Sequence, residues 1–164
     1  MMAVIISDIH DNLANLAKCL DYCRAQNITT MICCGDITNS DTVDYLAKNF
    51  AGTIHLIMGN VDNFDDGILT HYRNIRYYDR KGGHMIMDGK RIGFCHEPYH
   101  VKHLFAKGMY DIIFYGHTHK PWESQEHGVR LINPGTLGGV FQKATFAVWD
   151  SETGEVALQI LETM

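Results

Sequence analysis

The stretch MAVIISDIHDN, residues 2–12, decides how this chain folds. Its apolar run, residues 2–7, predicts a short buried strand. Asp8 and His10 follow that run, and Asn12 is placed to cap a helix over residues 12–27, where apolar side chains recur at helical spacing. A buried strand that leads through polar residues into an amphipathic helix is typical of an α/β protein.

The next segments repeat this order of strand and helix. TTMICC at 29–34 and TIHLIM at 53–58 predict the second and third strands. Between them, residues 40–50 predict a helix that opens with Ser40 or Asp41 as its cap. Alternating strands and helices imply parallel strands joined by right-handed crossovers.

The second half of the chain is richer in strands. HMIMD and RIGFC flank the dipeptide GK at 89–90, which predicts a hairpin turn there, and residues 99–108 predict a short helix ended by Gly108. Further strands are expected at 111–115, 129–133, 144–150 and 155–161. An α/β half followed by a β-rich half predicts two stacked sheets with helices outside.

Composition limits the kind of protein. The 164 residues are 46% hydrophobic, which suits one compact domain over residues 1–164. The formal net charge of -5 gives no basic surface for nucleic acid or anionic membranes. No apolar stretch approaches the roughly 20 residues that span a bilayer. The N-terminus lacks the features of a signal peptide, and five cysteines without disulfide spacing favour a reducing, cytoplasmic setting.

Metal-ligating side chains stand at the end of each of five predicted strands. In chain order they are Asp8 and His10, Asp36, Asn60 with Asp62, His96, and His117 with His119. The carboxyl ends of strands in open α/β sheets are where ligand sites form. The residues of each Asp–His or His–His pair are two apart, so in extended backbone both side chains face one way. Ordinary polar loop residues would explain one such pair, but they do not explain five coincident strand ends.

This set of oxygen and nitrogen donors indicates a divalent metal site. Such donors are typical of a site for a borderline divalent metal such as Mn, Fe, Ni or Zn, and not of a structural zinc site, whose ligands are mainly cysteines. Without Asp62, seven candidate ligands remain, which are too many for one four-coordinate ion but suit two ions that share a carboxylate. Two metals about 3.5–4 Å apart are a recurrent arrangement for cleaving phosphoesters, in which they acidify a water and neutralise charge on the phosphate.

The order of these motifs resembles that of the calcineurin-like metallophosphoesterases. The motifs are DIH at 8–10, GD at 35–36, GNVD at 59–62, the His96 strand end and GHTH at 116–119, and NPGT at 133–136 is similar to the NPGS turn of small bacterial and archaeal phosphodiesterases. The resemblance covers residues 4 to about 150. It implies a four-layer α/β/β/α sandwich of two mixed sheets flanked by helices.

The resemblance also implies how the ligands divide between two divalent ions, with manganese expected first and Ni, Fe or Zn as alternatives. Asp8, His10 and His119 would hold the first metal, while Asn60, His96 and His117 would hold the second. Asp36 would bridge them. Asp36 and Asn60 are therefore candidate catalytic residues as well as ligands.

The sequence departs from the family pattern at two places. Where many relatives have GNHE, this chain has Val61 and Asp62, and Asp62 is kept as a catalytic candidate. Where small relatives have HGH, CHEP at 95–98 puts Pro98 in place of the second histidine. A proton donor is thus missing. His100 is a candidate replacement, although an exposed helix residue is the simpler interpretation of it.

The function that the resemblance implies is a phosphodiesterase that hydrolyses a small phosphodiester with a metal-activated hydroxide at a dinuclear site. A scaffold that kept the fold and binds protein partners is one alternative, and a vacuolar sorting subunit resembles the family in that way. A phosphomonoesterase is another, although no obvious Arg accompanies the metal motifs. The sequence leaves the physiological substrate open, and also whether the chain self-associates as relatives often do.

Overall fold

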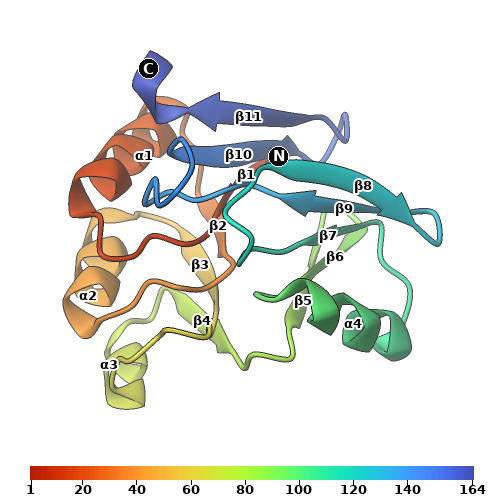
Figure 1. The fold of residues 1–164 in the computed structure, drawn as a ribbon, viewed down its shortest axis with the longest axis horizontal. Helices are drawn as coiled ribbons and strands as arrows, with labels where there is room; N and C mark the ends of the chain where they lie inside the picture. Colours follow the sequence, from red (N-terminus) through yellow and green to blue (C-terminus); the bar gives the residue numbers. More distant parts are fainter.

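Two mixed β-sheets lie face to face with helices on both outer sides in the computed structural model, which describes residues 1–164 except for the side chain of Asp66 (Figure 1). Three helices, drawn red to yellow, flank one sheet and the green helix α4 flanks the other. The helices are α1 (Leu13–Ala25), α2 (Ser40–Asn49), α3 (Asp66–His71) and α4 (Val101–Lys107), with short 3₁₀ turns at Pro98–His100 and Leu161–Thr163.

The larger sheet has six strands in the order β11-β10-β1-β2-β3-β4. Their bounds are β1 Met2–Ile6, β2 Thr30–Cys33, β3 Thr53–Ile57, β4 Ile75–Tyr78, β10 Thr145–Asp150 and β11 Val156–Ile160. β1 to β4 run parallel, whereas β10 pairs antiparallel with both β1 and β11. The expected parallel order of the first three strands is confirmed.

The smaller sheet has five strands in the order β5-β6-β7-β9-β8. Their bounds are β5 Gly83–Met87, β6 Lys90–Phe94, β7 Ile112–Phe114, β8 Trp122–Glu126 and β9 Val129–Asn133. β6, β7 and β9 are parallel, while β5 and β8 are antiparallel edge strands. Each sheet thus contains a set of adjacent parallel strands, β1 to β4 in the larger sheet and β6, β7 and β9 in the smaller one, and within each set the carboxyl ends lie at the same edge.

Three clusters of buried apolar side chains separate four layers. The first lies between the larger sheet and its helices, and includes Leu16, Leu46 and Phe146. The second lies between the two sheets, where Phe94 and Trp149 pack. The third covers the outer face of the smaller sheet beneath α4. The expected α/β/β/α sandwich is confirmed.

Several local expectations need correction. Helix α2 is capped by Asn39, whose side-chain oxygen accepts the Thr42 N–H, and not by Ser40 or Asp41. The hairpin between β5 and β6 turns at Asp88 and Gly89, both of which have positive φ, while Lys90 already belongs to β6. Positive φ at both turn residues matches the right-handed twist of the strands.

Among the described residues, none of the helices combines the length and the apolar character that a bilayer-spanning helix requires.

Candidate metal centre

The loops that follow the parallel strands carry the candidate ligands in an unusual backbone conformation. Five of these residues have left-handed φ values: Asp8 (53°), His10 (46°), Asp36 (56°), His117 (70°) and His119 (59°). Non-glycine residues seldom adopt such values, and where they do, the strain commonly accompanies a functional site. The expectation of extended backbone at the two pairs is therefore wrong, and His117 and His119 turn toward different groups of ligands.

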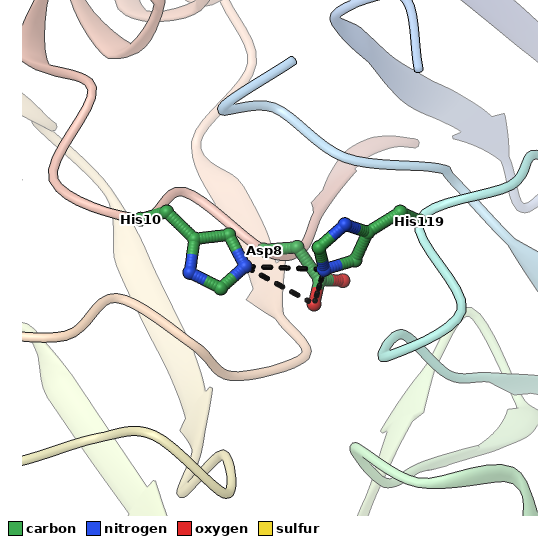
Figure 2. A group of neighbouring side chains, drawn as sticks. All are labelled: Asp8, His10 and His119. Carbon is green, nitrogen blue, oxygen red and sulfur yellow. Dashed lines mark hydrogen bonds and ion pairs between the residues drawn. The ribbon is translucent and has the colours of Figure 1, made fainter. Parts of the chain in front are cut away.

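Asp8, His10 and His119 form the first group (Figure 2). The Oδ1 atom of Asp8 lies 3.1 Å from Nε2 of His119 and 3.9 Å from Nε2 of His10. The two Nε2 atoms are themselves 3.1 Å apart. Three potential donor atoms thus point at one small space, although they come from the ends of β1 and β7 in different sheets.

The Asp8 carboxylate is buried at the centre of this first group. Its Oδ2 atom accepts the His117 backbone N–H at 3.0 Å, but its Oδ1 atom has no hydrogen-bond partner. A buried carboxylate oxygen without a donor is costly unless a cation or a proton reaches it. Gly116 allows this approach of the two loops, because a Cβ atom there would lie 1.9 Å from Oγ of Ser7.

Backbone carbonyls set the tautomers of two of the histidines. Nδ1 of His119 lies 3.1 Å from the Val140 carbonyl oxygen, and Nδ1 of His96 lies 2.7 Å from that of Cys34. A carbonyl oxygen only accepts, so each Nδ1 carries the proton and donates. Each Nε2 atom then faces the site with its lone pair, which is how metal-binding histidines are usually oriented.

Asp36, His96 and His117 form the second group, to which Asn60 adds a fourth donor. Oδ1 of Asn60 lies 2.8 Å from Nε2 of His96 and 2.8 Å from Nδ1 of His117. Because Nδ1 of His96 already carries the proton, its Nε2 atom and Oδ1 of Asn60 are both acceptors, and a second proton or a cation must lie between them.

The pKa values of the second group show the same need for positive charge. Burial opposes the charged forms of both Asp36 and His96, but their hydrogen bond and mutual charge outweigh it. As a result the pKa of Asp36 is lowered and the pKa of His96 is raised. The Asp36 and His96 side chains therefore each favour the charged state of the other.

Asp36 belongs to the second group and also faces the first. Its Oδ2 atom is 3.3 Å from Nε2 of His96 and 4.0 Å from Nε2 of His10. Oδ1 accepts the Val61 backbone N–H at 3.1 Å, which fixes the carboxylate in place. The donors around Asp36 are imidazole nitrogens, carboxylate oxygens and one amide oxygen, a set that fits two borderline divalent cations sharing one carboxylate.

Asp62 occupies a supporting position beside these ligands. Its carboxylate accepts the backbone N–H groups of Gly59 at 2.7 Å, Thr38 at 2.8 Å and Asp36 at 3.2 Å. Burial raises the pKa of Asp62, although the first two of these hydrogen bonds oppose the rise. Asp62 thus ties the loop after β2 to the loop after β3.

His100 is not an exposed helix residue, so that interpretation is wrong. Its exposed fraction is 6%, and its Nδ1 atom lies 3.3 Å from Oε2 of Glu97. Neither of these two buried atoms has a hydrogen bond. The pKa of His100 is lowered, chiefly by burial, while the charge of Glu97 opposes that shift.

Sequence reasoning missed the parts of the site that belong to the main chain. The Cys34 and Val140 backbone carbonyls orient two histidines, and the identity of these residues in the sequence does not indicate either role. The thiols near the ligands are buried, and burial raises the pKa of Cys95 to about 12, in keeping with a packing role.

Comparison with known proteins agrees with this geometry. The model of the calcineurin-like phosphoesterase superfamily domain matches residues 1–154. Phosphodiesterase MJ0936 of Methanocaldococcus jannaschii is 25% identical to this chain, across 96% of the chain and 98% of the relative. The solved structure of an archaeal phosphodiesterase is 25% identical to this chain and has a TM-score of 0.86. The match covers 98% of this chain and 99% of the solved chain.

A zinc complex of Vps29 from Entamoeba histolytica has a TM-score of 0.69, covers 97% of both chains and is 18% identical, which is a likeness of fold alone. The family match spans nearly the whole chain, and both archaeal relatives are phosphodiesterases. This chain therefore belongs to the calcineurin-like phosphoesterase superfamily and is a metal-dependent phosphoester hydrolase.

Proposed function

We propose that this protein is a phosphodiesterase that works with two divalent cations. The observation that carries the proposal is the position of the Asp36 carboxylate between two groups of donor atoms. One group consists of Asp8, His10 and His119, and the other of Asn60, His96 and His117. One carboxylate within reach of both groups suits a bridging ligand.

The bound cations would supply positive charge to the phosphate oxygens and acidify a water that attacks phosphorus. The chain's own residues do the rest. Asp36 and Asn60 would hold the cations, and Asp62 fixes the loops that carry these two residues through hydrogen bonds to the Asp36 and Gly59 backbone N–H groups. His100 is the candidate proton donor for the leaving group, in place of the histidine that Pro98 replaces.

A diester is favoured over a monoester as the substrate. A terminal dianionic phosphate usually meets additional fixed cationic groups, among which arginine is the most suitable. Among the described residues, the hydrogen bonds and ion pairs of the candidate ligands include no arginine. The similarity to phosphodiesterase MJ0936 supports the same choice.

A scaffold that binds protein partners is the competing function. The similarity in fold to Vps29 is the reason for considering a scaffold function. The seven donor positions all carry ligating side chains, and five of them sit in strained backbone, a cost that a purely structural role leaves unexplained. This supports catalysis.

Manganese is the metal we propose to test first, followed by Ni, Fe and Zn, since availability often decides occupancy. The remaining expectations, a single domain over residues 1–164 and a cytoplasmic location, are part of the same proposal.

The experiment is metal analysis combined with a hydrolysis screen. The chain is stripped with a chelator, reloaded with each metal, and assayed on an activated aryl diester and the matched aryl monoester. We expect about two metals per chain and faster turnover of the diester. Full metal loading without hydrolysis of either ester would favour the scaffold, and faster turnover of the monoester would favour a phosphomonoesterase.

A further inference from the structure

The loop between β9 and β10 is fixed to the metal centre at several points. The Leu137 N–H donates to the Ser7 carbonyl at 2.9 Å, and the Gly138 N–H donates to the Asp8 carbonyl at 2.9 Å. Two residues later, the Val140 carbonyl accepts the Nδ1 proton of His119 at 3.1 Å. The residue that follows, Phe141, is therefore held at a defined position beside a candidate ligand.

Two properties of Phe141 are unfavourable and contribute nothing to the stability of the fold. Its exposed fraction is 93%, so its ring adds almost nothing to the core. Its φ is +60°, a left-handed conformation that is unfavourable for an L-residue and a genuine outlier for a bulky side chain. A strained and exposed aromatic residue at the rim of a reaction centre points to a role in function.

The ring of Phe141 is oriented for stacking. It lies nearly parallel to the ring of His119, with an interplanar angle of 20° and a centroid distance of 6.4 Å. The high exposure leaves the Phe141 ring open to a further flat group beside His119. Stacking of a nucleobase on an aromatic side chain is worth about 1–3 kcal/mol.

Trp122 is the other exposed aromatic residue close to the GHTH loop, and it is a weaker candidate. Its exposed fraction is 55%, and the Lys120 ammonium lies 5.3 Å from its ring centroid. That cation already uses one face of the indole. Phe141 also differs in that its ring lies nearly parallel to the ring of a candidate ligand, with the two centroids 6.4 Å apart.

We infer that Phe141 is a stacking platform that selects phosphodiesters carrying a planar aromatic group next to the phosphate, an inference that rests on the proposed function. The shared chemistry is a flat aromatic ring near a phosphate, joined to it directly in an aryl ester and through ribose in a nucleotide. A nucleobase or a simple aryl ester can supply it. In this role Phe141 contacts the substrate and does not affect metal binding by the candidate ligands.

Binding of phosphate compounds to the metal-loaded protein tests this without requiring turnover. Titration calorimetry compares adenosine 5′-monophosphate with ribose 5-phosphate, which differ only in the base. A second pair, phenyl phosphate and methyl phosphate, differs only in a simple aryl ring. We expect the aromatic member of at least one pair to bind about 5- to 150-fold more tightly, the fold-change that corresponds to stacking. An advantage in the first pair alone identifies a nucleobase, and one in the second alone identifies an aryl group.

Variants at position 141 separate stacking from other effects. Phe141→Ala should abolish the advantage of the aromatic compound, Phe141→Leu should retain little of it because its side chain is not flat, and Phe141→Trp should preserve it. Metal content should be that of the wild type in all three. Met109→Ala, which alters another highly exposed apolar side chain, just after α4, is the matched control.

Equal affinity within both pairs in the wild type, or an aromatic advantage that persists in Phe141→Ala, would overturn the inference. Loss of metal in Phe141→Ala would also overturn it, since Phe141 would then act on His119 and not on the substrate. The proposed function fails separately: a fully loaded protein that hydrolyses no diester yet binds aromatic phosphates through Phe141 refutes the phosphodiesterase alone.

Discussion

The carboxylate of Asp62 joins two ligand-bearing loops at the scale of single residues. It accepts three backbone N–H groups, from Asp36, Thr38 and Gly59, and it is itself buried. A carboxylate offers enough lone pairs for all three donors, which explains why an acid suits this position. The residue thereby positions Asp36 and Asn60 without itself being a ligand in either group of donors.

Replacing Asp62 tests this supporting role. Asp62→Ala leaves buried N–H groups unpaired, each at a cost of roughly 1–3 kcal/mol, so we expect several kcal/mol of lost stability together with weaker metal binding. Asp62→Asn retains one oxygen acceptor and should lose less. Chemical denaturation and metal titration measure both effects. Wild-type stability in Asp62→Ala would show that these hydrogen bonds contribute nothing.

Replacing His100 tests which residue donates the proton to the leaving group. A well-placed acid typically accelerates proton transfer to a poor leaving group by 10²–10⁴-fold, while aryl leaving groups need little help. Because Pro98 replaces the usual histidine, we expect wild-type rates to depend steeply on leaving-group pKa. If His100 donates the proton, His100→Gln will slow alkyl diesters far more than aryl diesters.

A series of diesters with graded leaving groups, at saturating metal, measures that slope for the wild type and for His100→Gln, with His103→Gln as the control. An unchanged slope in His100→Gln would remove His100 from the mechanism. A flat wild-type slope, with chemistry limiting the rate, would mean that an efficient acid is present despite Pro98, and the slope of His100→Gln would then show whether it is His100.

At the scale of elements, apolar runs were enough to predict the first three strands and both long helices. β8 was missed because its sequence, WESQE, lies on an exposed edge and has no apolar alternation to indicate a strand. α3 and β4 were missed as well, since both are short and follow a turn-rich segment. The left-handed backbone of the ligands was also unpredictable, because contacts between loops impose it.

His55 on β3 links the stability of the larger sheet to pH. Its Nδ1 atom lies 2.9 Å from the hydroxyl of Tyr78 on β4, and burial, followed by the charge of Arg76, lowers its pKa to about 4. The unfolded chain therefore takes up this proton first, near pH 6.5, and stability is lost as the pH falls from about 6.5 toward 4.

His55→Gln should reduce that loss, because glutamine does not titrate and can still bond to the Tyr78 hydroxyl. Urea unfolding of the metal-free protein between pH 7 and 4.5 measures the difference, and His84→Gln at an exposed position is the control. An equally steep loss of stability in wild type and His55→Gln would contradict the buried, neutral state of His55.

At the scale of the whole molecule, the candidate metal centre joins the two sheets. Asp8, Asp36 and Asn60 follow strands of the larger sheet, while His96 and His117 follow strands of the smaller one. The sequence predicted these residues because the parallel strands share a carboxyl edge. It did not predict Phe141, since an exposed aromatic residue in a loop carries no periodic signal.

Removal of metal should therefore lower the stability of the entire fold. A ligand at 100 times its Kd stabilises by about 2.7 kcal/mol, which corresponds to roughly 5–10 °C in the melting temperature of a chain of this size. Thermal denaturation with and without chelator measures the shift. His119→Ala should show a smaller shift than the wild type. The same melting temperature in chelator and in excess metal would speak against a bound ion.

The most direct test of the central claim is the metal content of four purified chains: wild type, His119→Ala, His117→Ala and Asp36→Asn. After loading with manganese and removal of free metal, elemental analysis should give about two ions per wild-type chain and about one in each histidine variant. Asp36→Asn should retain fewer than two and lose diester hydrolysis, with the circular dichroism of all four unchanged, because a neutral amide cannot serve two cations as a carboxylate does. Two ions in every variant, or full activity in Asp36→Asn, would contradict the shared metal centre.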